Sequence, residues 1–200
     1  MKATIEQRFN ENLARVENLV KIYQDHLAGS GPGRRSHHKT DVLRAAVVLL
    51  HASMEDLLRS LARWKLPEAT PAVLSKIPLL SAAPALKFDL GALAAHRGEP
   101  VTALIEASVA GYLDRSNYNN TTELATLLES IGVGVAQVNA QFDELSILMN
   151  RRHLVVHRAD RDDQGGQGHH SVRSIGRTQV QDWVNAVREF GKNVLNQVPA

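Results

Sequence analysis

Apolar residues recur every three or four positions along most of this chain, the spacing of one face of an α-helix. The pattern predicts a first helix over 5–27, ended by the glycine-rich stretch 29–33, and a second over about 40–64. Five more helices are predicted, over 89–96, 100–113, 121–131, from about 138 to the basic segment near 152, and 179–198. We therefore expect an all-α chain, a single-domain helical bundle over 1–200 with flexible loops near 29–39 and 160–175.

The second predicted helix carries two stripes of residues at helical spacing. One is wholly apolar and is expected to face the core: Leu43, Val47, Leu50, Met54, Leu57 and Leu61. The other places charged groups among apolar ones: Arg44, Val48, His51, Glu55, Leu58 and Ala62. In the closing helix, the expected core positions are Val180, Trp183, Val184, Val187 and Val194. A glutamate on the mixed stripe must be either exposed or paired.

The composition of the chain excludes several classes of protein. Of the 200 residues 44% are hydrophobic, and no stretch is long and apolar enough for a membrane span, so we expect a protein without a membrane partner. The chain has no cysteine, which excludes disulfides and thiolate metal sites and fits a cytoplasmic location. Its first residues are polar and charged, so export is not expected. The net charge is only +2, so any nucleic-acid surface must be local.

Arginine and histidine are concentrated in the segment 151–160, which reads Arg-Arg-His-Leu-Val-Val-His-Arg-Ala-Asp. A guanidinium group can bind two phosphate oxygens at once, and an imidazole can exchange protons near neutral pH. The segment therefore favours phosphate chemistry. The alternative is an ordinary helix end whose charges are solvated.

Helical geometry separates the groups of this segment. His153 and His157 are four residues apart and share a face, whereas Arg152 and His157 point about 140° from one another. Either the last turn unwinds near Val156, or a second copy of the chain completes the site across a two-fold axis. Arg152 lies on the apolar flank of its helix and needs a carboxylate partner, for which Glu55 is the candidate. Arg151 is expected to be more exposed.

The order Arg152, His153, three apolar residues and His157, at the end of a long helix, resembles the catalytic motif of the HEPN superfamily of helical ribonucleases. Residues 47–58, in which Glu55 follows an apolar run, resemble an early helix of that superfamily, especially the RiboL-PSP type of prokaryotic defence and toxin systems. The resemblance implies a HEPN-type fold and a homodimeric endoribonuclease that needs no metal or other cofactor. It also implies RNA as substrate and a possible antitoxin or defence-system partner protein.

The resemblance also implies roles for the residues. His157 would act as general base or acid at the ribose 2′-hydroxyl and the leaving 5′-oxygen, and Arg152 would stabilise the charge that develops on phosphorus. His153 would assist in positioning, and Glu55 would orient Arg152 from behind the site. Arg151 and Arg158 would bind RNA. The products would carry 2′,3′-cyclic phosphate and 5′-hydroxyl ends.

Several residues have simpler interpretations. Glu55 could be a solvated residue that pairs locally with His51 or Arg59. His153 and His157 could bind a metal ion, but only Asp160 is near enough in sequence to be a third ligand. The remaining candidates are more often ordinary loop and turn residues than sites: His37, His38, His169 and His170, and Tyr118, which could otherwise stack on an RNA base.

Two other functions fit the same helices. A non-catalytic HEPN-like scaffold would bind a partner protein or a nucleotide, because a fold does not determine the chemistry of its site. A helical regulator would bind DNA or RNA without cutting it. That function would need a denser basic face than this chain carries.

Overall fold

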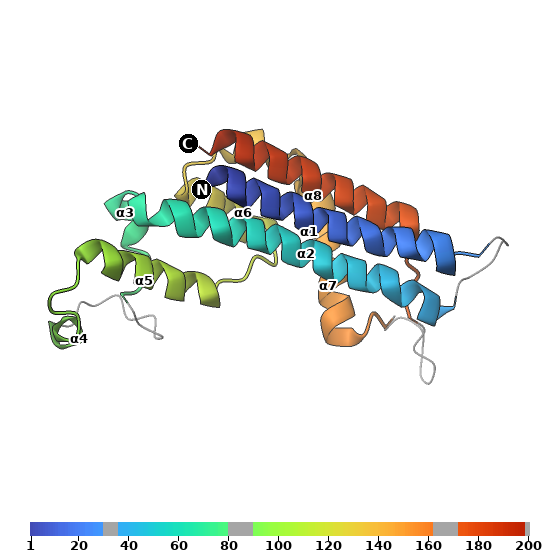
Figure 1. Cartoon of the computed structure of the whole chain (residues 1–200), viewed down its shortest axis with the longest axis horizontal. Helices are drawn as coiled ribbons and strands as arrows, with labels where there is room; N and C mark the ends of the chain where they lie inside the picture. Colours follow the sequence, from blue (N-terminus) through green and yellow to red (C-terminus); the bar gives the residue numbers. More distant parts are fainter. Residues whose placement is uncertain (30–35, 80–89, 162–171, 199–200) are drawn as a thin grey trace.

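Three long helices form the main layer of the molecule in the computed structural model, which describes residues 1–29, 36–79, 90–161 and 172–198. They are α1 (Lys2–Ile22), α2 (His37–Lys65) and α8 (Arg177–Gln197), and they lie side by side along the long axis (Figure 1). The described residues contain no β-strand and only one isolated antiparallel bridge, between Arg161 and Val172. The prediction of an all-α fold is confirmed.

Each of these helices buries one apolar face against the other two. The predicted core stripe of α2, from Leu43 to Leu61, is buried throughout, and so are the five positions predicted for α8. In α1 the buried residues follow helical spacing: Ile5, Phe9, Leu13, Val16 and Val20. Helices α1 and α8 approach closely at Gly191, where an added Cβ would overlap the Phe9 ring. The core therefore lies between the three long helices and extends to buried residues of the shorter helices that follow α2.

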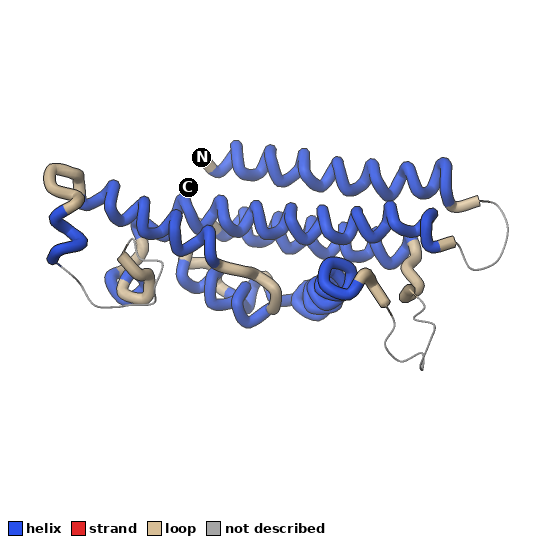
Figure 2. The backbone as a smooth tube through the Cα atoms, turned by 90° about the horizontal axis from the view of Figure 1, so that it is seen from below, coloured by secondary structure: helices blue, strands red, loops and turns tan. Residues whose placement is uncertain are grey.

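Helix α7 (Phe142–Arg158) runs across this layer rather than along it, and Figure 2 shows it nearly end-on. Only the first half of α7 contributes buried residues, namely Leu145, Leu148 and Met149, so its C-terminal end projects from the layer. The chain between α2 and α7 forms α3 (Pro71–Leu74), α4 (Leu90–Ala94), α5 (Val101–Arg115) and α6 (Thr121–Ser130). None of the described helices has the length and apolar character that a membrane crossing requires.

Several helix boundaries differ from those predicted. Helix α2 begins at His37 instead of near 40, so His37 and His38 lie in its first turn and not in a loop. Helix α7 begins at Phe142 instead of near 138, because two short 3-10 turns precede it. The first helix continues as a π-helical turn, Tyr23–Leu27.

The two predicted flexible loops lie largely outside the described residues. Most of the first falls on residues 30–35, and most of the second, with His169 and His170, falls on residues 162–171. The second predicted loop begins at Asp160, which the structure does describe. It lies in the turn that follows the end of α7 at Arg158, and its side chain is fully buried.

Candidate functional site

The two histidines of the basic segment lie together at the projecting end of α7. Their rings have centroids 4.7 Å apart with planes inclined at 42°, and both side chains are exposed. This placement confirms that His153 and His157 share a face. The helix continues without interruption to Arg158, and the chain turns only at Ala159, which has left-handed backbone angles. The predicted alternative of unwinding near Val156 was therefore wrong.

Arg152 points to a different side of α7 from the two histidines. Its Nη1 donates to Asn119 Oδ1 at 3.5 Å, on the segment between α5 and α6. Among the described residues, no carboxylate forms an ion pair with the Arg152 guanidinium. Because the helix is intact, one chain presents Arg152 and His157 about 140° apart.

Contrary to the prediction, Glu55 contacts neither Arg152 nor His157. Its Oε1 accepts a hydrogen bond from the Tyr118 backbone N–H at 3.4 Å, and its Oε2 lies 3.9 Å from His51 Nδ1. The segment 118–119 lies between the two residues and explains the difference. Its backbone N–H at Tyr118 donates to the Glu55 carboxylate, and the Asn119 side chain accepts from the Arg152 guanidinium. The alternative of a solvated Glu55 in a local pair is met only in part, because the Glu55 side chain is 18% exposed and forms no hydrogen bond with the nearby His51 ring. A supporting role for Glu55, acting through this segment, remains a prediction.

His51 lies behind Arg152, on the mixed stripe of α2, and is fully buried. Burial lowers the pKa of His51 below its ordinary value of 6.5; the nearby Glu55 carboxylate opposes this change and the Arg152 charge adds to it. The ring is therefore kept neutral inside the fold. It does not reach solvent, so His51 is not part of the exposed surface of the site.

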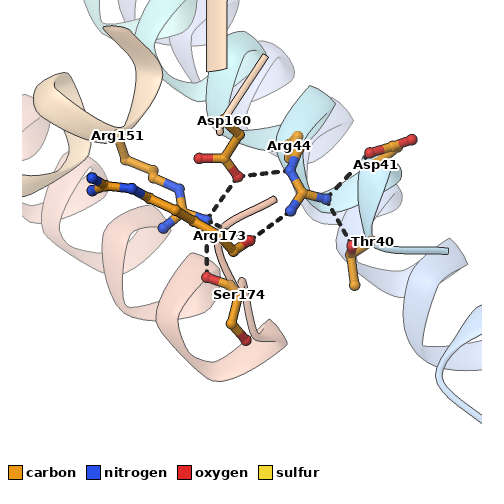
Figure 3. Close-up of polar contacts among 7 residues, drawn as sticks. All are labelled: Thr40, Asp41, Arg44, Arg151, Asp160, Arg173 and Ser174. Carbon is orange, nitrogen blue, oxygen red and sulfur yellow. Dashed lines mark hydrogen bonds and ion pairs between the residues drawn. The ribbon is translucent and has the colours of Figure 1, made fainter. Parts of the chain in front are cut away.

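Arg151 is not the exposed residue that was expected. Its side chain is only 12% exposed, and its Nη2 donates to Asp160 Oδ2 at 2.8 Å and to Ser174 O at 2.9 Å. Burial lowers the pKa of Arg151, and the Asp160 charge opposes that change. The physical reason is the left-handed turn at Ala159 and Asp160, which brings the Asp160 carboxylate back against α7 (Figure 3). An RNA-binding role for Arg151 stays untested, but its guanidinium faces the interior.

The remaining predicted residues divide into exposed and buried groups. Arg158 is exposed and, with His157 and Arg161, borders a shallow hollow at the end of α7. Tyr118 is only 3% exposed, and burial raises its pKa to about 12. The Arg59 guanidinium lies 5.4 Å from the Tyr118 ring centroid, so this ring is not available to stack on a base.

A metal site involving Asp160 is not formed by this arrangement. The Asp160 carboxylate contacts Arg44 and Arg151 and does not join the two histidines. In the described parts of the chain, no cluster of three or more histidine, aspartate or glutamate side chains could hold a metal ion.

Sequence reasoning missed three residues of this region. Arg44 and Asp160 form a buried ion pair with Nε and Oδ2 2.7 Å apart, and Asn119 contacts Arg152. One signal was available for Arg44, because an arginine between core positions of α2 needs a buried acid. Nothing in the spacing identified Asp160 as that acid, since the two residues are 116 positions apart.

Comparisons with models of protein families, with curated proteins and with solved structures give no match for this chain. The resemblance to HEPN ribonucleases thus rests on the two quoted segments alone.

Proposed function

We propose that this protein is a metal-independent endoribonuclease of the HEPN type, whose site is the projecting end of α7. The observation that carries the proposal is an exposed pair of imidazoles at the end of α7, with a guanidinium on another side of the same helix that pairs with no carboxylate in the described part of the chain. Such groups are available to bind a phosphate and to move protons beside it.

The proposed reaction is an internal transesterification of RNA. His157 takes the proton from the ribose 2′-hydroxyl, and the 2′-oxygen forms a bond to phosphorus. The bond from phosphorus to the 5′-oxygen breaks, and that oxygen leaves with a proton, supplied by an imidazolium such as that of the partner copy's site. Arg152 stabilises the additional negative charge on the phosphoryl oxygens, His153 helps to position the group, and Arg158 binds neighbouring phosphates.

The active unit in this proposal is a two-fold homodimer. One intact α7 directs Arg152 and His157 to different sides, and a second copy supplies the missing side when the two helix ends face one cleft. Val156, on the last turn, is 47% exposed and offers an apolar contact beside the charged groups. The setting that fits is a cytoplasmic toxin or phage-defence effector, with an antitoxin or defence protein as a possible partner.

The same divergence of Arg152 and His157 favours a second candidate, a non-catalytic HEPN-like scaffold that binds a partner protein or nucleotide. The two candidates differ in what expression does to a cell. The ribonuclease should slow growth when expressed, and His157→Ala should relieve this effect. The scaffold should have no such His157-dependent effect.

The direct test is cleavage of total RNA by purified protein in the presence of EDTA. We expect wild-type protein to cleave RNA and His157→Ala to lose on the order of 10²-fold or more in rate, because a positioned general base is removed. The matched control is His38→Ala, which changes another exposed histidine, in the first turn of α2, and should keep wild-type activity. Strict dependence on a divalent ion, or equal activity in both variants, would overturn the proposal.

A further inference from the structure

The last turn of α7 is not held by apolar packing. The buried residues of this helix are Leu145, Leu148 and Met149, and all of them precede the basic segment. Val156 is 47% exposed, and His153 and His157 are exposed as well. Helix ends without buried contacts tend to fray. Something other than the hydrophobic core must therefore fix the direction of this turn.

The residue that ends the helix is in an unfavourable backbone conformation. Ala159 and Asp160 have φ of 48° and 57°. These values lie in the left-handed region, which residues other than glycine rarely adopt. Two such residues in succession persist only where the surroundings fix them. The Asp160 amide closes the turn by donating to Leu154 O at 2.9 Å.

The Asp160 carboxylate supplies these surroundings. It is fully buried, and its Oδ2 accepts from Arg44 Nε of α2 at 2.7 Å and from Arg151 Nη2 of α7 at 2.8 Å (Figure 3). A buried carboxylate between two guanidinium groups is strongly constrained in position, because losing either contact leaves charge without a partner in the interior.

The same cluster also anchors the segment that leads into α8. Arg173 O accepts from Arg44 Nη2 at 2.7 Å, and the Arg173 backbone N–H donates to Asp160 O at 2.8 Å. Asp160 therefore joins α2, the end of α7 and the start of the closing segment at one point. His157 is three residues before it, on the turn that this point fixes.

We propose that Asp160 is a positioning residue, whose buried carboxylate between Arg44 and Arg151 fixes the last turn of α7 and so the placement of His157. Its consequence for catalysis rests on the proposed ribonuclease function. Its consequence for the helix does not, so the two can be tested separately.

The first measurement is amide hydrogen exchange in Asp160→Asn. Asparagine has nearly the same side-chain shape as aspartate and tolerates left-handed backbone angles, so the substitution removes mainly the charge. We expect amides of residues 155–160 to exchange on the order of 10- to 100-fold faster, while those of residues 145–150 change only as global stability does. The matched control is Asp41→Asn, because the Asp41 carboxylate contacts the same Arg44 at 3.2 Å but is 61% exposed. The control should leave the last turn protected.

Arg44→Lys serves as the second variant if Asp160→Asn does not fold. It keeps the positive charge but loses the planar contact with both the carboxylate and Arg173 O, so the same local loss of protection is expected. Unchanged protection of residues 155–160 in a folded variant, or a uniform loss along all of α7, would overturn the positioning role.

The second measurement is RNA cleavage by the same variants. A misplaced general base lowers kcat with little change in KM, and we expect a loss on the order of 10- to 100-fold in kcat for Asp160→Asn but none for Asp41→Asn. Equal kcat in Asp160→Asn and wild type would overturn the catalytic consequence. If the wild-type protein itself does not cleave RNA, the proposed function fails, and hydrogen exchange alone decides the positioning role.

Discussion

Arg44 and His51, the two buried basic residues on the mixed stripe of α2, are accommodated in different ways. The charged Arg44 guanidinium donates to the Asp160 carboxylate and to the Arg173 carbonyl. His51, two turns further along the same helix, has no carboxylate of the described residues closer than 3.9 Å and is kept neutral by burial. The difference follows from the two side chains, since guanidinium cannot lose its proton in a protein whereas imidazole can.

The depressed pKa of His51 predicts a dependence of stability on pH. The unfolded chain binds a proton at His51 near the ordinary pKa of 6.5, whereas the folded chain does so only at lower pH. The free energy of unfolding should therefore fall as the pH drops below that value, with a slope of at most about 1.4 kcal/mol per pH unit from this residue. The fall should end once the folded His51 is protonated.

Urea unfolding of wild type and His51→Leu between about pH 5 and 7 checks this, because the difference between the two proteins removes the contribution of other groups. The variant should have the shallower slope. His38→Gln, at an exposed position, is the control and should follow wild type. Parallel curves for wild type and His51→Leu would contradict the assignment of His51 as a buried neutral ring.

At the scale of helices, the periodicity of apolar residues predicted which segments are helical but not where each helix begins and ends. The core positions of α2 and α8 repeat at regular helical spacing, so the apolar face of each helix could be predicted. The start of α2 at His37 was not predictable, because two histidines after a glycine-rich stretch are equally typical of a loop. The 3-10 turns before α7 contain apolar residues at helical spacing, and for this reason the predicted start of the helix, near 138, was too early in the chain.

Gly191 sets how closely α8 packs against α1. We expect Gly191→Ala to destabilise the fold by about 1–3 kcal/mol, since the added methyl group would overlap the Phe9 ring and come within 3.0 Å of Leu57. Gly111→Ala in α5 is the control. Among the described residues its new methyl group would meet only Arg115 Nη1, at an ordinary 3.7 Å, so the change should stabilise by about 0.5–1 kcal/mol through helix propensity.

Thermal and urea unfolding of the two glycine variants provides the measurement. Opposite signs are expected. A neutral Gly191→Ala would mean that α1 and α8 can separate without loss, and that the close approach is not required.

At the scale of the whole molecule, the sequence predicted which helix carries the candidate chemistry but not how distant segments surround it. The His153 and His157 pair follows from their spacing of four on one helix. The contacts of Arg152 with Asn119 and of Asp160 with Arg44 could not be predicted, because each joins segments far apart in sequence whose relative placement depends on packing. The direct pairing of Glu55 with Arg152 failed for the same reason.

A site shared between two copies predicts complementation. Mixing Arg152→Ala and His157→Ala chains should restore cleavage above that of either variant alone, because one of the two shared sites in a mixed dimer keeps both residues. Arg152→Ala mixed with itself is the matched control. Wild-type activity that persists in a monomer at every dilution would contradict a shared site.

The most direct test of the central claim uses an RNA oligonucleotide whose cleaved position has been mapped, beside the same oligonucleotide with a single 2′-deoxyribose immediately 5′ to the cleaved bond. In EDTA, we expect the all-ribose strand to give 2′,3′-cyclic phosphate and 5′-hydroxyl ends, and the substituted strand to remain intact at that position, because its nucleophilic oxygen is missing. Cleavage of the substituted strand at the same bond, or products with 5′-phosphate ends, would contradict the account.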